Sequence, residues 1–247
     1  MKNRKIIACL DIREGRTVKG IKFKDLCDAG DPVELARNYV SQGVDELVFL
    51  DISATKEKRR PQIDWIKRVA REVNIPFTVG GGIRNLEEAR LVFEAGADKI
   101  SINSAAVANP ELITALADEF GKKRIVLAID AKRMKNEWKV VCNGGDFPTN
   151  LSAVAWAKKG ETLGAGRILL TSMDNDGMKN GFAIKLTRSV SEAVNIPVIA
   201  SGGAGRMKDF KTVFKQTKAI AALGAGVFHF GAINISTLKT YLKQQDS

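Results

Sequence analysis

The sequence predicts an α/β fold, a (β/α)8 TIM barrel with an internal twofold half-barrel repeat. The first observation is the length, because 247 residues suit one barrel that forms a single domain over residues 1–247. The second is a repeat: VNIPFTVGGGI, which begins at Val73, returns as VNIPVIASGGAG, which begins at Val194. The third is an alternation of short apolar runs with longer amphipathic stretches, which is typical of parallel βα units.

The repeat extends along the chain and defines two half-barrels of about residues 1–122 and 123–247. The two glycine-rich phrases are offset by 121 residues, and a similar offset relates IIACLD at 6–11 to IVLAID at 125–130. Self-similarity of this kind indicates a duplicated structural unit. An open doubly wound sheet is the alternative, but two copies of four βα units close naturally into a ring.

Eight apolar, β-branched runs predict strands that are buried on both faces. In chain order they lie near residues 6–11, 46–51, 76–80, 98–102, 124–130, 167–172, 197–201 and 219–223. Helical patterns lie between them. In DPVELARNYVSQG, for example, Asp31 is the expected N-cap, Pro32 is the first helical residue and Gly43 ends the helix.

The composition is that of a globular protein, with 45% hydrophobic and 27% charged residues. The formal net charge of +11 raises nucleic acid as a partner, but the basic residues are scattered and no basic run is interleaved with aromatic residues. We therefore expect no nucleic-acid binding. An acidic or phosphorylated substrate accounts for part of the positive charge.

The N-terminal apolar stretch stops at Asp11, which makes it too short for a signal peptide or a membrane span. We expect a cytoplasmic protein without membrane contact. Cys9, Cys27 and Cys142 are odd in number and unrelated in spacing, which indicates reduced thiols and matches no zinc motif. We expect no disulfide, no metal and no cofactor.

Paired glycines end the third and seventh predicted strands, where Gly81 and Gly82 correspond to Gly202 and Gly203. At the carboxyl ends of barrel strands, glycines let backbone N–H groups approach an anion, so two such pairs indicate a substrate with two phosphates. An isolated glycine pair is more often a tight turn. The symmetric placement of two pairs is what favours binding.

Two aspartates end the first and fifth predicted strands. Asp11 and Asp130 occupy equivalent positions and should face each other across the barrel mouth. Such a pair suits general acid–base catalysis, since a shielded carboxylate can have a raised pKa and donate a proton. A lone Asp at such a place is usually a helix cap or a solvated turn residue, and the duplication favours catalysis.

Other polar residues follow the remaining strands. Asp51 ends the second strand and Thr171 is its repeat mate. Asp176 and Gly177 follow in TSMDNDG, where the Asp-Gly pair is either a binding element or a simple turn. Lys19 lies in REGRTVKGIKFKD, a basic segment of the kind that closes over anionic substrates, with a solvated lysine as the equal alternative.

His229 is the only histidine, and VFHFGAI places it among aromatic residues after the last strand. This setting favours a structural role. Neither a Ser-His-Asp nor a Cys-His arrangement is then available, which disfavours nucleophilic hydrolysis.

Several motifs together resemble one family. ACLDIREGRTVKG, DELVFLDIS, TVGGGIR, LAIDAKR, GAGRILLTSMDNDG and VIASGGAG are similar to the cyclase subunits of imidazole glycerol phosphate synthases in histidine biosynthesis. The resemblance covers nearly the whole chain, and CLD together with AIDAKR favours the cyclase over the related isomerase barrel. It implies that a bisphosphorylated ribulosyl-formimino aminoimidazole carboxamide ribonucleotide reacts with ammonia to give imidazole glycerol phosphate and aminoimidazole carboxamide ribonucleotide. The ammonia would come from a glutaminase subunit that docks on the opposite end of the barrel to form a heterodimer.

The resemblance also assigns residues. It makes Asp11 and Asp130 the catalytic acid and base, and it puts Lys19 on a mobile loop. One phosphate site would consist of backbone groups of Gly82, Asn103 and Ser104, and the other of Gly203, Ala225 and Gly226. The mouth positions around the substrate would be Asp51, Asn103, Thr171, Asp176 and Ser201.

Three positions depart from the family pattern. Gly226 replaces a serine whose hydroxyl usually meets the phosphate, so that site would rely on backbone N–H groups. Asp146 stands where a basic or neutral residue is usual, which places a negative charge near a loop that serves an anionic substrate. Ile220 replaces an aspartate at the start of the last strand.

A further departure concerns the amino-terminal end of the barrel, where the family closes an ammonia gate with a ring of two basic and two acidic residues. The matching residues here are Lys5, Glu46, Lys99 and Arg167, which are three cations and one anion. Because like charges repel more strongly where water is partly excluded, we expect a gate that is rearranged or partly open.

Two other interpretations stay open. A paralogous barrel relays ammonia for sugar amidination in polysaccharide synthesis, and it would lack the aspartate pair or the mouth motifs. A non-catalytic partner that activates a glutaminase would be compatible with the unusual gate and the weakened phosphate site. Retention of Asp11, Asp130, Lys19 and Asn103 argues against both.

Overall fold

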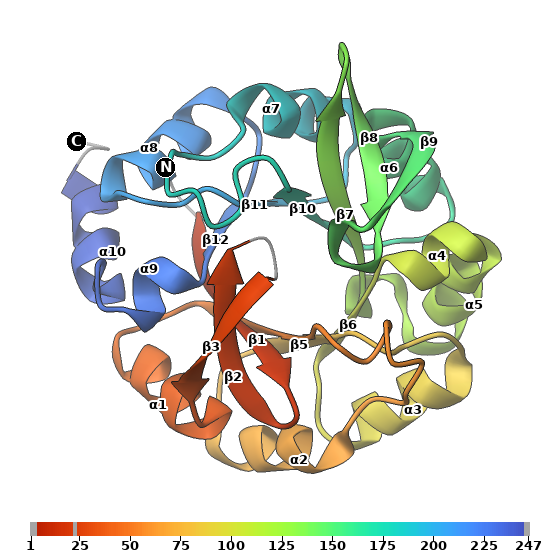
Figure 1. The fold of residues 1–247 in the computed structure, drawn as a ribbon, viewed down its shortest axis with the longest axis horizontal. Helices are drawn as coiled ribbons and strands as arrows, with labels where there is room; N and C mark the ends of the chain where they lie inside the picture. Colours follow the sequence, from red (N-terminus) through yellow and green to blue (C-terminus); the bar gives the residue numbers. More distant parts are fainter. Residues whose placement is uncertain (1–3, 22–23, 245–247) are drawn as a thin grey trace.

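Eight parallel strands form a closed barrel in the computed structural model, which describes residues 4–21 and 24–244, the side chains of residues 19–26 excepted. Each strand pairs with the next around the ring, and the last pairs with the first (Figure 1). The predicted barrel and its eight strands are therefore confirmed, although the first and fifth strands run beyond their predicted ends. In ring order the strands are β1 (Lys5–Arg13), β4 (Glu46–Asp51), β5 (Phe77–Gly80), β6 (Lys99–Ile102), β7 (Ile125–Met134), β10 (Arg167–Ser172), β11 (Val198–Ser201) and β12 (Ala221–Gly224).

Helices surround the barrel and cover its outer face (Figure 1). The longer ones are α1 (Pro32–Ser41), α2 (Ile63–Glu72), α3 (Leu86–Glu94), α5 (Glu111–Phe120), α6 (Ala153–Thr162), α7 (Ile184–Ala193), α8 (Met207–Gln216) and α10 (Ile235–Gln244). Shorter elements are α4 (Ser104–Ala108), α9 (Gly226–His229) and the 3-10 turns η1 (Lys122–Arg124) and η2 (Asn143–Gly145). Within the described part of the chain, no helix is long and apolar enough to cross a membrane.

Helix α1 begins and ends as predicted. The Asp31 side chain accepts hydrogen bonds from the backbone N–H groups of Val33 and Glu34, and Pro32 is the first helical residue. Gly43, with a φ of 79°, lies just beyond the end of the helix. The apolar face of α1 packs on the barrel, and each large apolar side chain buried in this way contributes about 1.5–3 kcal/mol.

Period-two alternation along the strands divides each strand between an outer core under the helices and an inner core within the barrel. Ile6 belongs to the outer cluster and Ile7 to the inner one. The inner cluster consists of Ile7, Cys9, Val48, Val126, Leu169, Ile199, Ala221 and Leu223. Lys5, two residues before Ile7, lies at the amino end of β1, and Asp11, two residues after Cys9, lies toward its carboxyl end. An apolar interior therefore separates two polar ends.

Two β-hairpins extend the barrel where the sequence suggested loops. The segment after β1 forms β2 (Arg16–Ile21) and β3 (Lys24–Gly30), and the segment after β7 forms β8 (Glu137–Cys142) and β9 (Phe147–Ser152) (Figure 1). Glu14 and Gly15 both have positive φ, as the tight turn between β1 and β2 requires. The hairpins occupy equivalent places, so the twofold repeat extends to them.

Candidate active site

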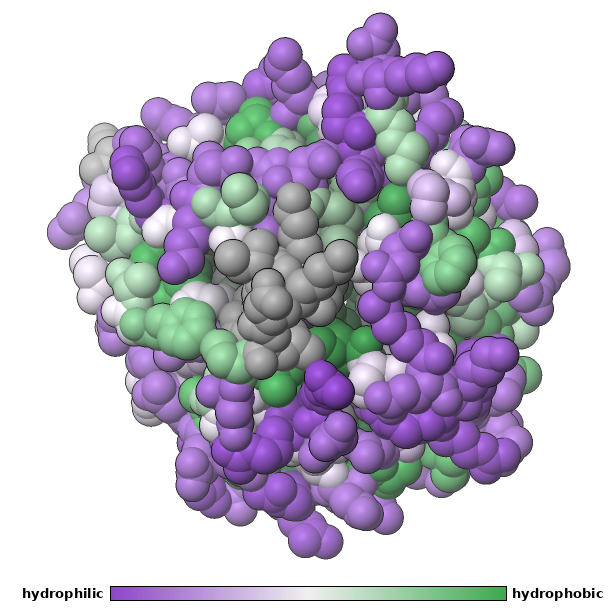
Figure 2. Space-filling view, in the orientation of Figure 1, coloured by the Kyte–Doolittle hydropathy of each residue, from purple (hydrophilic) through white to green (hydrophobic). Residues whose placement is uncertain are grey.

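A cavity of about 870 Å³ lies at the carboxyl ends of the barrel strands, on the face that Figure 2 shows, where hydrophilic residues predominate. Its lining includes predicted site residues from every strand of the barrel or from the residues directly after it: Asp11, Asp51, Gly82, Asn103, Ser104, Asp130, Thr171, Asp176, Ser201 and Ala225. Gly177, Gly202, Gly203 and Gly226 are not among the lining residues. Lys19 lies in β2, and its side chain falls outside the described part of the structure.

The two aspartates occupy equivalent places in the backbone. Asp11 of β1 pairs with Val18 of β2, and Asp130 of β7 pairs with Val141 of β8. The prediction that each Asp ends its strand is wrong, because both strands continue beyond the barrel into the hairpins. Each Asp also pairs with the neighbouring barrel strand on its other side. Both carboxylates are therefore carried by paired strands rather than by loops.

Asp130 has an environment that holds a proton near neutral pH. Removal from water raises the pKa of Asp130 to about 7, and the charges of Asp176 and Asp11 add to this effect. Hydrogen bonds from Asn103 and Thr171 act in the opposite direction. Asn103 Nδ2 donates to Asp130 Oδ2 at 2.9 Å. A carboxyl group of this kind can donate or accept a proton during a reaction.

Asp11 is almost completely buried, with 2% of its surface exposed. The Cys9 thiol donates to Asp11 Oδ1 at 3.8 Å. Period-two spacing puts both side chains on the inner side of β1, so the contact follows from the sequence IIACLD once the strand direction is known. Cys9 was not predicted as a site residue because a single inward cysteine is usually a packing residue.

Asp51 lines the cavity but is engaged by the protein itself. Arg59 Nη1 and Nη2 donate to its two carboxylate oxygens at 2.9 and 2.8 Å. The backbone N–H groups of Ser53 and Ala54 also donate to Asp51 Oδ1. Asp51 therefore fixes the segment between β4 and α2, residues 52–62, as one wall of the cavity. Arg59 was not predicted, because KEKRR offers several basic residues and spacing alone does not select one.

The paired glycines allow close backbone contacts that repeat in both halves. A Cβ on Gly81 would lie 2.1 Å from the carbonyl oxygen of Asp51, and a Cβ on Gly202 would lie 2.6 Å from that of Ser172. The strand register agrees with this correspondence, so the repeat mate of Asp51 is Ser172 and the prediction of Thr171 is wrong. Both glycines have positive φ, 96° and 86°. The tight-turn interpretation of these glycines is therefore supported by the packing, and it applies alongside any role in anion binding.

Four charged residues begin strands at the opposite end of the barrel. Lys5, Glu46, Lys99 and Arg167 are the first residues of β1, β4, β6 and β10. Lys5 Nζ and Arg167 Nη1 lie 2.6 Å from the two carboxylate oxygens of Glu46, and Lys99 Nζ lies 3.6 Å from one of them. The three cations therefore converge on one carboxylate. Repulsion between the three cations therefore does not drive them apart, because each lies within ion-pair distance of Glu46.

The electrostatics of the ring agree with this convergence of three cations on Glu46. Burial alone raises the pKa of Glu46, but hydrogen bonds from Arg167 and Lys5 and the charge of Lys99 outweigh burial and lower it to about 2. Burial lowers the pKa of Lys99, and Arg167 and Lys5 add to that lowering while Glu46 opposes it. The ring thus holds Glu46 firmly ionised.

His229 lies outside the cavity lining. Its Nδ1 forms a hydrogen bond with the hydroxyl of Tyr39, and the two rings pack with centroids 5.9 Å apart. This contact ties α9 to α1, in keeping with the structural role predicted for the histidine.

A (β/α)8 barrel with two aspartates enclosed in one cavity at the carboxyl ends of its strands defines a class of barrel enzyme equipped for acid–base chemistry. Residues 5–234 match the family model described as histidine biosynthesis protein. A protein of a Hydrogenobaculum species named imidazole glycerol phosphate synthase subunit HisF is 59% identical over 98% of this chain and 97% of its own length. Subunits of the same name from Pyrococcus furiosus and Geobacillus kaustophilus are 57% and 55% identical, over 97% and 99% of this chain and 95% and 98% of their own lengths.

The chain therefore belongs to the histidine-biosynthesis protein family, among the cyclase subunits of imidazole glycerol phosphate synthase. The resemblance found in its sequence motifs is confirmed.

Proposed function

We propose that this protein cyclises the bisphosphorylated ribulosyl-formimino aminoimidazole carboxamide ribonucleotide with ammonia, and releases imidazole glycerol phosphate, aminoimidazole carboxamide ribonucleotide and water. The observation that carries the proposal is the pair of aspartates in one cavity, of which Asp130 has a pKa raised to about 7 while Asp11 lies in the equivalent place of the other half. Two proton-transfer groups on opposite sides of one substrate suit a reaction in which several protons move.

The proposed chemistry divides the proton transfers between these two groups. Ammonia adds to the ketone carbon of the ribulosyl unit, and the ketone oxygen leaves as water. The C–N bond to the carboxamide ribonucleotide then breaks as the imidazole ring closes. Asp130 in its protonated form donates to the departing oxygen, and Asp11 accepts a proton from the attacking nitrogen. Asn103 and Thr171, which donate hydrogen bonds to Asp130, orient its carboxyl group.

The two phosphates of the substrate would lie at opposite sides of the mouth. We call Gly82, Asn103 and Ser104 the first phosphate site, and all three line the cavity. The second phosphate site would be Gly203, Ala225 and Gly226, of which Ala225 lines the cavity. Gly226 offers no hydroxyl, so this second site depends on backbone N–H groups and is expected to bind phosphate more weakly.

Ammonia would come from a glutaminase subunit docked at the amino-terminal end of the barrel as a heterodimer. This part of the proposal rests on the names of the relatives, which are subunits of a synthase, and on the apolar interior between the charged ring and the cavity. Lys5, Glu46, Lys99 and Arg167 would form the ammonia gate. We place the enzyme in the cytoplasm, as expected for a biosynthetic subunit with reduced cysteines.

Cyclisation of the substrate with excess ammonium and no partner subunit tests the proposal. The intact protein should turn over, whereas Asp11→Asn and Asp130→Asn should each lose at least about a hundredfold in kcat. Asp118→Asn removes an exposed carboxylate of α5 and serves as the matched control. Folded intact protein without turnover would instead favour the paralogue in sugar amidination or a glutaminase-activating partner.

A further inference from the structure

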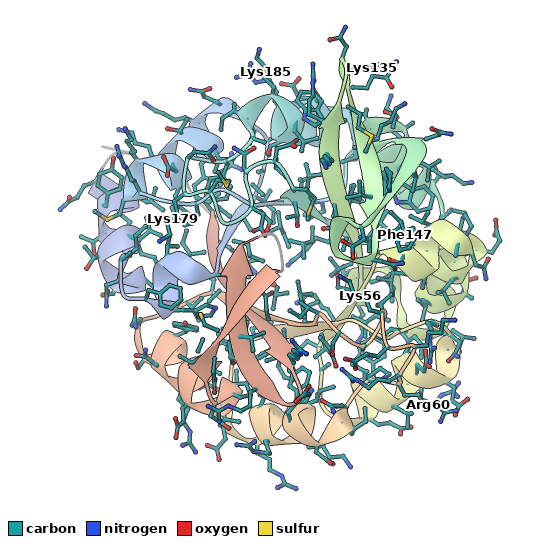
Figure 3. The ribbon with its side chains drawn as sticks, viewed as in Figure 1. Lys56, Arg60, Lys135, Phe147, Lys179 and Lys185 are labelled. Carbon is teal, nitrogen blue, oxygen red and sulfur yellow. The ribbon has the colours of Figure 1, made fainter. Side chains whose placement is uncertain are left out.

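An ion pair joins two segments at the rim of the cavity that are far apart in the sequence. Lys56 Nζ lies 2.6 Å from Asp146 Oδ2, and both side chains are about half exposed, at 46% and 43%. Lys56 belongs to the segment between β4 and α2, and Asp146 lies in the turn between β8 and β9. Figure 3 labels Lys56 and, close above it in this view, Phe147, the residue that follows Asp146. The pair therefore connects the first half-barrel to the second at the mouth.

Both segments pack directly against the first phosphate site. A Cβ on Gly82 would lie 2.9 Å from the Cβ of Ala54 and 3.1 Å from the carbonyl oxygen of Arg59, so the segment that carries Lys56 covers Gly82 closely. On the other side, the backbone N–H of Asn143 donates to Ser104 Oγ at 3.0 Å. The turn that carries Asp146 is therefore fixed to Ser104.

Among the described cationic side chains that line the cavity, Lys56 has the ion pair that is exchanged most easily. Of the described side chains that line the cavity, those of Arg13, Lys56 and Arg84 are cationic. Arg84 is held by Glu88, whose side chain is 2% exposed. Arg13 Nε lies 3.7 Å from Glu14 Oε1, at the turn between β1 and β2. The Lys56–Asp146 pair is half exposed, and exposed ion pairs contribute little to stability, so breaking it costs little.

We infer that Lys56 binds the substrate phosphate at the first phosphate site and that Asp146 competes with that phosphate for the same ammonium group. A phosphate monoester carries about 1.5 to 2 negative charges near neutral pH, whereas Asp146 carries one, so the exchange favours the phosphate. When the phosphate arrives, Lys56 leaves Asp146 and pairs with the ligand. This inference rests on the proposed function, because the first phosphate site is part of it.

The exchange of Lys56 between Asp146 and phosphate is confined to one half of the barrel. The residue at the position equivalent to Lys56, 121 residues later, is Gly177, which has no side chain. The second phosphate site therefore has no matching lysine from this position. Asp146 therefore lowers phosphate affinity at one end of the substrate only. Its negative charge near an anion-binding loop is explained because Asp146 pairs with Lys56 when no ligand is bound.

Two measurements on four variants test the inference. The variants are Lys56→Gln, Asp146→Asn, the double variant, and Lys58→Gln as a matched control, because Lys58 lies on the same segment but does not line the cavity. The first measurement is the Kd for inorganic phosphate by calorimetry, which requires no turnover. The second is KM and kcat for the bisphosphorylated substrate with excess ammonium.

We expect Lys56→Gln to raise both Kd and KM by about five- to twentyfold without lowering kcat, since one charge-assisted contact is lost. Asp146→Asn should lower both by about two- to fivefold, because the resting competitor is gone. The double variant should behave like Lys56→Gln alone, and Lys58→Gln should change neither quantity.

Two results would overturn the inference. One is an unchanged Kd in Lys56→Gln. The other is tighter phosphate binding by Asp146→Asn even when Lys56 is absent, since the aspartate would then act on the ligand directly. Phosphate binding that follows the expected pattern in a protein without turnover would keep the inference and reject the proposed function instead.

Discussion

Glu46 and Arg167 stand at equivalent positions of the two half-barrels, 121 residues apart, and form an ion pair across the amino-terminal end of the barrel, with Arg167 Nη1 2.6 Å from Glu46 Oε2. Their strands, β4 and β10, lie on opposite sides of the ring of eight. At the mouth the repeat places like residues, Asp11 and Asp130, in equivalent sites. At the amino-terminal end it places opposite charges in equivalent sites, and these charges form an ion pair.

Replacing Glu46 with glutamine should destabilise the protein strongly, because three cations lose the carboxylate on which they converge. We expect the free energy of unfolding, measured by urea denaturation, to fall by about 3–5 kcal/mol. Glu119→Gln, which breaks the surface pair with Arg90, is the control and should cost at most about 1 kcal/mol. Equal losses in the two variants would contradict a special role of the buried ring.

The raised pKa of Asp130 predicts a pH-dependent gain of stability in Asp130→Asn. The unfolded chain releases this proton near pH 4, whereas the folded protein keeps it until about pH 7, so the native state loses stability as pH rises between these values. The asparagine variant has no titrating group at this position, so it does not lose stability in this way as pH rises. Its stability relative to the intact protein should therefore increase from pH 4 to pH 7 by about 3–4 kcal/mol and then level off. Urea denaturation across this range measures the difference, and a constant difference would show that the pKa is not raised.

The Arg59–Asp51 pair predicts non-additive effects on stability. Arg59→Met leaves the buried Asp51 carboxylate uncompensated and should cost about 2–4 kcal/mol in the free energy of unfolding. Adding Asp51→Asn to that variant removes the charge and should recover part of the loss. A double-mutant cycle should give a coupling of at least about 1 kcal/mol. Additive losses would mean that the two side chains do not stabilise the segment together.

Two glycines with similar backbone angles should respond differently to alanine. Gly121 has a φ of 87° and nothing within 4 Å of an added Cβ, so Gly121→Ala should cost only the strain of a positive φ, about 1–2 kcal/mol. Gly81 has a φ of 96°, and an added Cβ would also meet the carbonyl oxygen of Asp51 at 2.1 Å. Gly81→Ala should therefore cost several kcal/mol and raise KM, because β4 and its following segment must move. Similar thermal unfolding of the two variants would refute this close contact.

The barrel could be predicted from the sequence because its strands are continuous apolar runs and because the duplication supplies each observation twice. The hairpins could not be predicted in the same way. REGRTVKGIKFKD is short, charged and rich in glycine, so it resembles a loop, and it becomes a strand pair only because β1 offers an edge beyond the barrel. The pairing of Asp11 with Val18 depends on tertiary structure, and no local sequence pattern predicts it.

The same distinction, between local sequence pattern and tertiary contact, applies to the candidate site. That Asp11 and Asp130 line one cavity could be predicted, because a carboxylate at the same place in two repeats is unlike a chance turn residue. Lys56 and Asp146 lie 90 residues apart in irregular segments, and their contact depends on how two connections fold over Ser104 and Gly82. The ring charges could be identified, but their convergence on Glu46 depends on side-chain reach across the barrel, which spacing does not encode.

The extension of β1 and β7 beyond the barrel has a consequence for how this enzyme can change. Because Asp11 and Asp130 each pair with a strand on both sides, the distance between the proposed acid and base is set by the sheet. Lys56, which we propose binds phosphate, and its partner Asp146 lie on the connecting segments 52–62 and 143–146. Replacing these connecting segments can therefore change which ligand is bound while the two aspartates stay in place. Ligand choice and the proposed proton transfer can thus change independently in this chain.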